Sequence, residues 1–171
     1  VVGIVFRLLQ YFAKFLDRKT AQIDGVIANM VVAVELIQKV VDPMTARRFG
    51  RIVNITSGSV KMPLFGLDLS SGARAGLTAF LGGVARSVAA SNVTINFLLP
   101  GSFDTHRLQS GQEAAAKRLG IPVETVAEQR RAEIPAQRFG EPHEFGKACA
   151  FLCSSHAGYI TGQSLLIDGG A

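Results

Sequence analysis

The chain has 171 residues, 48% of them apolar and 18% charged, and its net charge is +5. This length predicts a single domain over residues 1–171 with a substantial core, and the apolar content excludes a disordered chain. The sequence lacks a run of about 18 apolar residues, which would indicate a membrane span. It also lacks a basic stripe with interleaved aromatics, which would indicate nucleic-acid binding. We therefore expect no membrane or nucleic-acid partner, and interpret the charge as solvated faces plus an anionic small-molecule ligand.

The first part of the chain predicts a short strand and a long helix. Val1–Phe6 is typical of a short buried strand, whereas Leu8–Arg18 is ambiguous between a loop and a helix. Over Asp24–Arg48, apolar residues recur at three- and four-residue steps, which predicts a helix. We expect Pro43 to kink or end this helix and Gly50 to close it.

The middle of the chain predicts two strands with a helix between them. Arg51–Thr56 is β-branched and continuous, as in a parallel sheet covered on both faces. A loop over Gly58–Asp68 leads to a helix over Leu69–Ala90 that contains four glycines. Small residues permit close approach by another helix, so this helix is expected either in a subunit interface or simply packed on the sheet. Val93–Leu99 is the next predicted strand.

The last part of the chain predicts three helices and a final strand. Gln112–Leu119 and Pro122–Ala132 are helical pieces in a polar excursion, and Glu141–Ser154 is a further helix with a proline in its first turn. Ser164–Ile167 is the last predicted strand. Strands that alternate with helices predict an α/β fold with a parallel sheet.

The two cysteines, Cys149 and Cys153, lie four residues apart on a predicted helix among small apolar residues. We interpret them as small buried hydrophobes rather than as a disulfide or metal ligands, because only His156 lies close by. Free thiols suit a reducing compartment, so a cytoplasmic location is expected.

Polar residues follow two of the predicted strands at the point where each strand ends. The segment Arg51-Ile-Val-Asn-Ile-Thr-Ser57 ends in a hydroxyl, and the next helix carries Ser70 and Arg74 one turn apart. The segment Asn96-Phe-Leu-Leu-Pro-Gly101 ends the second strand, and Thr105 follows it. Because the carboxyl ends of parallel strands meet at one crevice, this layout predicts a redox active site there.

These motifs resemble the short-chain dehydrogenase/reductases, most closely the 3-oxoacyl-(acyl-carrier-protein) reductase-like group. The resemblance runs from about Asn29 to the C-terminus and includes Arg138-Phe-Gly-Glu-Pro142, Tyr159-Ile-Thr-Gly-Gln163 and Ile167-Asp-Gly-Gly170. It implies a Rossmann-type doubly wound parallel sheet, present here from its fourth strand onward. It also implies NAD or NADP as cofactor, a small carbonyl or alcohol substrate such as an acyl thioester, and a homodimer or homotetramer joined through the two long helices.

The resemblance also assigns roles to individual residues. The family's catalytic Asn, Ser, Tyr and Lys positions fall on Asn29, Ser57, Ser70 and Arg74 in this sequence. Arg74 would also hold the cofactor ribose, Pro100, Gly101 and Thr105 would contact the nicotinamide, and residues 104–135 would form a mobile substrate lid. The alternatives are a surface asparagine for Asn29, a turn hydroxyl for Ser57 and a capping role for the loop residues.

Ser70 departs from the family pattern, which has a tyrosine at this position. A phenol has a pKa of about 10 that a neighbouring cation can lower, whereas a serine hydroxyl is a far weaker and shorter acid. Ser70 therefore needs a water or another residue to serve as general acid. Arg74 can stabilise an oxyanion but cannot release a proton near neutral pH. Tyr11 and His106 are candidate substitutes, with uninvolved loop residues as the alternative.

The family's first strand, its Gly-x-x-x-Gly-x-Gly phosphate loop, the selector after its second strand and its Asn-Asn-Ala-Gly turn have no counterpart here. The choice between NAD and NADP is therefore not specified. A half-domain would expose an edge strand and an apolar face, so we expect that the protein has further residues before Val1.

Three functions are consistent with these residues. The first is an NAD(P)-dependent oxidoreductase that reduces a 3-oxoacyl-like carbonyl or oxidises an alcohol by hydride transfer. The second is a degenerate, non-catalytic member of the family that acts as a binding or oligomer-scaffold protein. A serine hydrolase is a weak third, because Ser57 lies in Ile-Thr-Ser-Gly-Ser and not in Gly-x-Ser-x-Gly.

Overall fold

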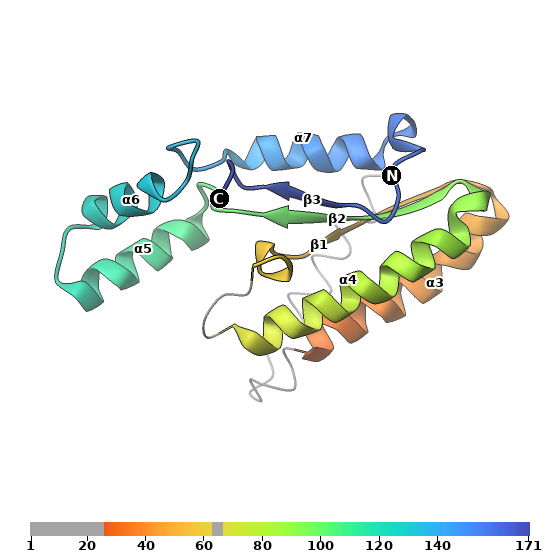
Figure 1. The fold of residues 1–171 in the computed structure, drawn as a ribbon, viewed down its shortest axis with the longest axis horizontal. Helices are drawn as coiled ribbons and strands as arrows, with labels where there is room; N and C mark the ends of the chain where they lie inside the picture. The colour runs from red at the N-terminus through yellow and green to blue at the C-terminus, as the bar shows by residue number, and fades with distance from the viewer. Residues whose placement is uncertain (1–25, 63–66) are drawn as a thin grey trace.

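A computed structural model of the chain describes residues 26–62 and 67–171. Within them, three parallel strands form one sheet in the order β1 (Gly50–Ile55), β2 (Val93–Pro100), β3 (Ser164–Ile167). Helices α3 and α4 cover one face of this sheet and α7 covers the other (Figure 1). The predicted α/β doubly wound architecture is thereby confirmed. The predicted strand Val1–Phe6 and the ambiguous Leu8–Arg18 lie outside the described residues.

The first described helix begins with the π-helical turn η1 (Ile27–Val31) and continues as α3 (Val32–Ala46). Pro43 lies inside α3, which continues for three residues after it and ends at Ala46; the backbone N–H of Arg47 then donates to the carbonyl oxygen of Pro43 at 3.3 Å. The chain then turns at Arg48, whose φ is 53°.

Gly50 does not close this helix, so that prediction was wrong; it is the first residue of β1. A Cβ at Gly50 would lie 2.6 Å from Met44 Sδ. A glycine is needed here because the strand passes directly against the end of α3, while Arg48 supplies the left-handed turn.

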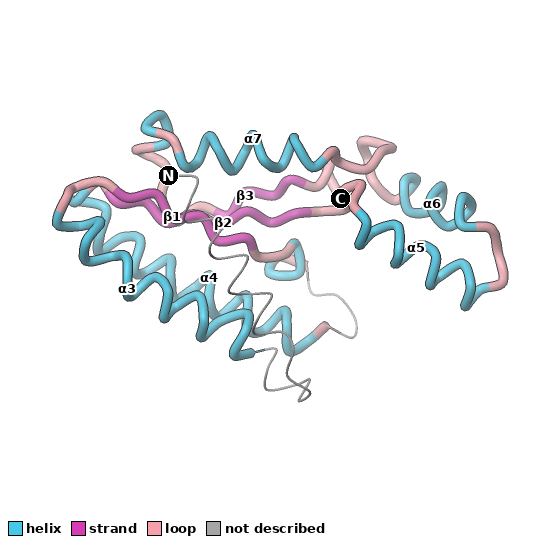
Figure 2. Tube along the Cα trace, turned by 180° about the vertical axis from the view of Figure 1, so that it is seen from behind, coloured by secondary structure: helices cyan, strands magenta, loops and turns pink. Residues whose placement is uncertain are grey.

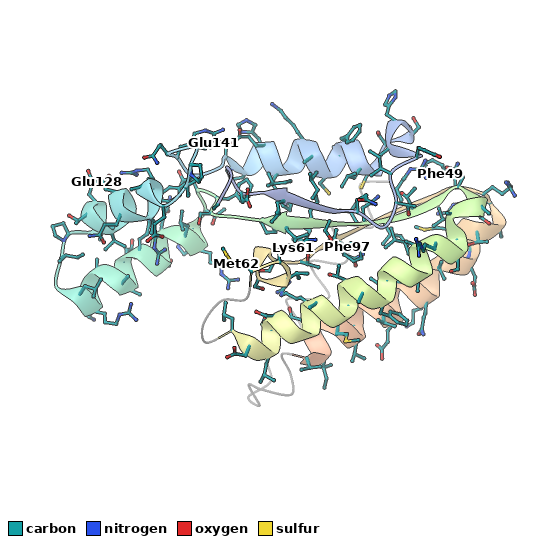
Figure 3. All side chains as sticks on the ribbon, viewed as in Figure 1. Phe49, Lys61, Met62, Phe97, Glu128 and Glu141 are labelled. Atoms are coloured by element: carbon teal, nitrogen blue, oxygen red, sulfur yellow. The ribbon has the colours of Figure 1, made fainter. Side chains whose placement is uncertain are left out.

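The main core lies between the sheet and the helices α3 and α4 (Asp68–Val88). Strand β2 is the centre of the sheet and is buried along nearly its whole length, as expected for a strand covered on both faces. Figure 3 shows Phe97 between the sheet and α4, where it is fully buried. The buried members of this cluster are Ile37 from α3, Leu77, Leu81 and Ala85 from α4, and Ile95, Phe97 and Leu99 from β2.

The opposite face of the sheet is covered by α7 (Pro142–Cys153), which packs Leu152 against Leu98 of β2. Asn96 is a polar residue in the middle of this buried strand. Its Nδ2 donates to the carbonyl oxygen of Ile160 at 2.8 Å, and its Oδ1 accepts from the backbone N–H of Gln163 at 3.0 Å. These bonds fix the segment that leads into β3, which has the predicted bounds.

Helices α5 (His106–Leu119) and α6 (Val123–Ala132) extend beyond the carboxyl end of the sheet (Figures 1 and 2). The predicted start of α5 at Gln112 was wrong, because the Thr105 hydroxyl accepts a hydrogen bond from the backbone N–H of Leu108 at 3.4 Å and caps the helix earlier. Gly120, with φ 68°, ends α5.

Helix α7 begins with a capping box in which Glu141 and Glu144 bond each other's backbone N–H. Arg138 donates to both carboxylate oxygens of Glu144 at 2.8 Å. The thiols of Cys149 and Cys153 on this helix are free and half-buried, so no disulfide joins them. In the described part of the chain, no helix is long and apolar enough to cross a membrane, and no group of three metal-ligating side chains is present.

Candidate active site

The carboxyl ends of β1 and β2 lie side by side, which places the predicted site residues at one edge of the sheet. The backbone N–H of Thr56, the residue that follows β1, donates to the carbonyl oxygen of Leu98 near the end of β2 at 2.9 Å. The backbone N–H of Gly101 in turn donates to the carbonyl oxygen of Ile167 at the end of β3. Residues that follow these strand ends therefore face a common region.

Ser57 follows β1 and caps the short 3-10 helix η2 (Gly58–Val60). Its Oγ accepts a hydrogen bond from the backbone N–H of Ser59 at 3.2 Å. This contact is the turn-hydroxyl role that the sequence left as an alternative. The hydroxyl hydrogen is still available to a further acceptor, since the bond uses only an oxygen lone pair.

Ser70 and Arg74 are in contact on the first turns of α4. The guanidinium Nε of Arg74 donates to Ser70 Oγ at 3.3 Å, and its Nη1 donates to the carbonyl oxygen of Thr56 at 3.1 Å. The predicted one-turn spacing therefore brings the two side chains together. Arg74 also ties α4 to the end of β1, next to Ser57.

The Arg74 guanidinium is partly withdrawn from water and has a like charge nearby. Burial, and then repulsion from Arg107, lower the pKa of Arg74 below its usual value. An arginine nevertheless stays protonated near neutral pH. Among the described residues neither arginine pairs with a carboxylate, so this region carries excess positive charge.

A cavity of about 440 Å³ opens between α3, the end of β1 and α4; we call it the helix-side cavity. Both Asn29 and Arg74 line it, so two of the predicted catalytic residues share one space. Two further lining residues, Asn54 and Thr56, each bury a side-chain polar atom that has no hydrogen-bond partner among the described residues. Orphaned polar atoms at a cavity wall indicate a site for water or a ligand.

A second cavity, of about 520 Å³, lies at the ends of β1 and β2 and beneath α5; we call it the loop cavity. The three predicted nicotinamide contacts, Pro100, Gly101 and Thr105, all line it. Phe103 and Phe145 form part of its apolar wall and meet edge to face, with ring centroids 5.5 Å apart. The two cavities share Ile55, Pro100 and Arg107.

Two of the loop-cavity residues also have structural tasks. The Thr105 hydroxyl donates to the carbonyl oxygen of Phe103 at 3.3 Å in addition to capping α5. A Cβ at Gly101 would lie 2.6 Å from the Cα of Asp168, so the glycine admits the C-terminal segment. The capping alternative for Thr105 thus describes a contact that is present, alongside its place at the cavity.

The remaining sequence candidates do not line either cavity. Ser57 and Ser70 are absent from both linings within the described chain, although their neighbours Thr56 and Arg74 are present. His106 is exposed at the start of α5 and also lies outside both. Tyr11 lies outside the described residues.

The sequence did not single out Arg107 and Arg130, which the structure places at the loop cavity. A helix start at Thr105 would have put Arg107 in its first turn and close to the strand ends. Nothing in the sequence marks Arg130, because its position depends on how α6 packs against α5.

Comparison with known proteins identifies the relatives of this chain. The family model described as enoyl-(acyl carrier protein) reductase matches residues 2–171. Nodulation protein G of Azospirillum brasilense is 33% identical over 162 residues, which cover 94% of this chain and 60% of that protein. The 3-oxoacyl-[acyl-carrier-protein] reductase FabG of Vibrio cholerae is 34% identical over 142 residues, 83% of this chain and 54% of that protein.

Solved structures give the same result. YwfH, an NADPH-dependent reductase involved in bacilysin biosynthesis, superposes with a TM-score of 0.80 at 30% identity, over 87% of this chain and 57% of that one. A 3-oxoacyl (acyl-carrier-protein) reductase from Agrobacterium tumefaciens with NADP bound gives 0.74 at 29% identity, over 85% and 54%. The chain thus spans between about half and three-fifths of the length of these relatives.

Proposed function

The chain belongs to the enoyl-(acyl carrier protein) reductase family of short-chain dehydrogenases/reductases, and from this premise we propose that the protein is an NAD(P)-dependent oxidoreductase. It reduces a carbonyl, or oxidises an alcohol, by hydride transfer. The observation that carries the proposal is the convergence of Pro100, Gly101 and Thr105 on one cavity, with Arg74 on the adjoining one. Residues far apart in sequence thereby share one connected region at the strand ends.

The residues at the two cavities fit a nicotinamide cofactor. The loop cavity has apolar walls at Ile55 and Pro100 against which a flat ring can lie, and the helix-side cavity has the orphaned polar atoms of Asn54 and Thr56. When bound, the cofactor supplies the hydride. Arg74 would hold its ribose hydroxyls.

The chain's own residues would position the source of the proton and stabilise the negative charge that develops on the carbonyl oxygen. The Arg74 guanidinium would stabilise negative charge on a carbonyl oxygen, directly or through the Ser70 hydroxyl to which its Nε donates. Ser57 would orient that oxygen, and Asn29 would support a water relay. Because a serine hydroxyl is too weak an acid near neutral pH, the proton would come from water in contact with Ser70.

Helices α5 and α6 would act as the substrate lid that the sequence predicts over residues 104–135. They extend beyond the sheet and close one side of the loop cavity through Arg107, Leu108 and Arg130. The substrate would be a small carbonyl or alcohol compound, including an acyl thioester. Exposed apolar residues on η1 and α4, among them Val31, Leu69 and Phe80, favour a homodimer or homotetramer through the two long helices.

The second candidate function is a non-catalytic member of the family, and the observation that favours it is Ser70 in place of a phenol. The test is hydride transfer by the purified full chain, with NADH and NADPH and with 3-oxoacyl thioesters, ketones and alcohols, followed by nicotinamide absorbance. We expect turnover with at least one substrate. Cofactor binding without turnover of any substrate would contradict the oxidoreductase function and support the non-catalytic binding protein.

The substitution Ser70→Tyr tests the missing acid directly. A positioned general acid contributes about 10²–10⁴-fold to a rate, so we expect kcat to rise at least about tenfold in this variant. Ser87→Tyr, on the exposed side of the same helix, is the matched control and should leave kcat unchanged. Equal rates for both variants would contradict the assignment of Ser70 to the acid position.

A further inference from the structure

Two arginines from neighbouring helices face the loop cavity without a counter-charge. Arg107 lies on the first turn of α5 and Arg130 near the end of α6, and both line the cavity of about 520 Å³. Its other walls are mostly apolar. No aspartate or glutamate of the described chain is part of the lining.

The absence of a partner for these two arginines contrasts with their neighbours. Arg131, next in sequence on α6, pairs with Glu124, and Arg138 pairs with Glu144. In the described part of the chain, neither Arg107 nor Arg130 has an ion pair or a side-chain hydrogen bond. Arg118, at the other end of α5 and outside the cavity, also has no ion pair in the described chain, so Arg107 and Arg130 are distinguished by where their unpaired charge lies, at the wall of an apolar cavity.

The position of Arg130 shows how its charge reaches the cavity. A Cβ at Gly111 would lie 3.8 Å from Arg130 Nη1, so the guanidinium crosses from α6 against the side of α5. It approaches α5 where that helix carries no side chain. Arg107, one helical turn earlier on α5, lines both this cavity and the helix-side cavity that holds Arg74.

Unpaired positive charge at the wall of an apolar cavity attracts an anionic ligand, and guanidinium groups bind carboxylate and phosphate through paired hydrogen bonds. Resting on the proposed oxidoreductase function, we propose that the substrate carries an anionic group, a carboxylate or a phosphate, bound by Arg107 and Arg130. Its apolar part packs on Phe103, Leu108 and Phe145. A cavity of this size suits a small-molecule substrate.

The test compares anionic substrates with neutral analogues of the same carbonyl compound. The full chain is assayed with a keto acid and its methyl ester, and with a 3-oxoacyl coenzyme A thioester and its N-acetylcysteamine thioester, which lacks the phosphates. We expect a preference of at least about tenfold in kcat/KM for one anionic member of a pair, because a hydrogen bond to a charged group contributes that much. The pair that shows the preference distinguishes carboxylate from phosphate.

The double variant Arg107→Gln, Arg130→Gln should lose most of this preference, so that the ratio of kcat/KM between the anionic and neutral compounds falls about tenfold. Arg118→Gln, on the last turn of α5 and outside the cavity, is the control and should keep the ratio. Equal use of both members of each pair by the unmodified chain, or an unchanged ratio in the double variant, would overturn the proposal.

Binding without turnover separates this proposal from the proposed function. Calorimetric titration with the keto acid, with the coenzyme A thioester and with their neutral analogues is carried out on the unmodified chain and on the double variant. Loss of anion binding in the variant, without hydride transfer by any form, would uphold the anion site and reject the oxidoreductase. Turnover of neutral carbonyls with no anion preference would do the reverse.

Discussion

The helix pair α3 and α4 and the helix pair α5 and α6 are built for different tasks. The first pair, which we call the inner pair, lies on the sheet and buries a continuous apolar cluster in which Leu81 and Ala85 are fully buried. The second pair, which we call the outer pair, lies beyond the sheet, and Glu128 on α6 points outward into solvent (Figure 3). Between them, α5 and α6 bury mainly small or polar residues, such as Ala116, Ala127 and Gln112.

This difference shows that the two pairs do not contribute equally to the core of the fold. The inner pair holds Arg74 on a rigid support, because tight apolar packing fixes the helix that carries it. Each pair buries one side-chain polar atom without a hydrogen-bond partner among the described residues, Ser71 Oγ on α4 and Gln112 Nε2 on α5, so the pairs differ in their apolar packing. We therefore expect the outer pair, which lacks such an apolar cluster, to be the part that moves or varies with the substrate.

The largest expected effect is on the free energy of unfolding when the core of the inner pair is truncated. Leu81→Ala removes a fully buried side chain and should lower the free energy of unfolding by about 2–5 kcal/mol in urea denaturation. Leu69→Ala, on the same helix but 52% exposed, should change it by less than about 0.5 kcal/mol. Similar losses in both would show that α4 is not held by its packed face.

The next effect is on catalysis, and it depends on the proposed oxidoreductase function. Arg74→Gln removes charged hydrogen bonds to the Ser70 hydroxyl and the Thr56 carbonyl. Charged hydrogen bonds contribute about 1.5–3 kcal/mol, so kcat/KM for hydride transfer should fall about 10- to 150-fold. Arg86→Gln, in the last turn of the same helix, is the control. If kcat/KM is retained in Arg74→Gln, the inner pair supplies only a scaffold.

A smaller effect is expected where the outer pair begins. Thr105→Ala removes the hydroxyl that caps α5 and should weaken this helix by about 1 kcal/mol. Amide hydrogen exchange in α5 should become about fivefold faster, while exchange in α4 stays the same. Ser110→Ala, an exposed position within α5, should not accelerate exchange. Faster exchange throughout the molecule would mean that the two pairs unfold as one unit.

The smallest effect concerns the junction between the outer helices and α7. Hydrogen bonds from Arg138 and from the backbone of Glu141 lower the pKa of Glu144 from 4.5 to about 2. A carboxylate with a lowered pKa stabilises the fold above pH of about 4.5, and this contribution is lost as the pH falls towards 2.

The melting temperature of Glu144→Gln should therefore lie slightly below that of the unmodified chain at neutral pH, and the two should converge on acidification. Glu113→Gln, an exposed carboxylate on α5, is the control for the loss of a negative charge. A difference between Glu144→Gln and the unmodified chain that does not depend on pH would show that the ion pair with Arg138 adds nothing to the junction.

The sequence by itself determined the α/β alternation, the parallel sheet and the family. Apolar periodicity and β-branched runs are local signals, which is why β3 has its predicted bounds and α4 begins within one residue of its predicted start. The contact between Ser70 and Arg74 is also local, since one helical turn separates them. Local signals were insufficient at Gly50, where close packing against Met44 explains the glycine.

Only the tertiary structure decided which distant residues share a space. Arg107 and Arg130 meet the end of β2 at one cavity because α5 and α6 fold back against each other beyond the sheet, and no local pattern specifies that packing. The bond from Arg74 to the Thr56 carbonyl likewise joins two elements across the crevice. Chemistry at strand ends depends on such long-range contacts. The sequence could therefore predict the polar residues that follow the strands, but not the arginines that lie near them.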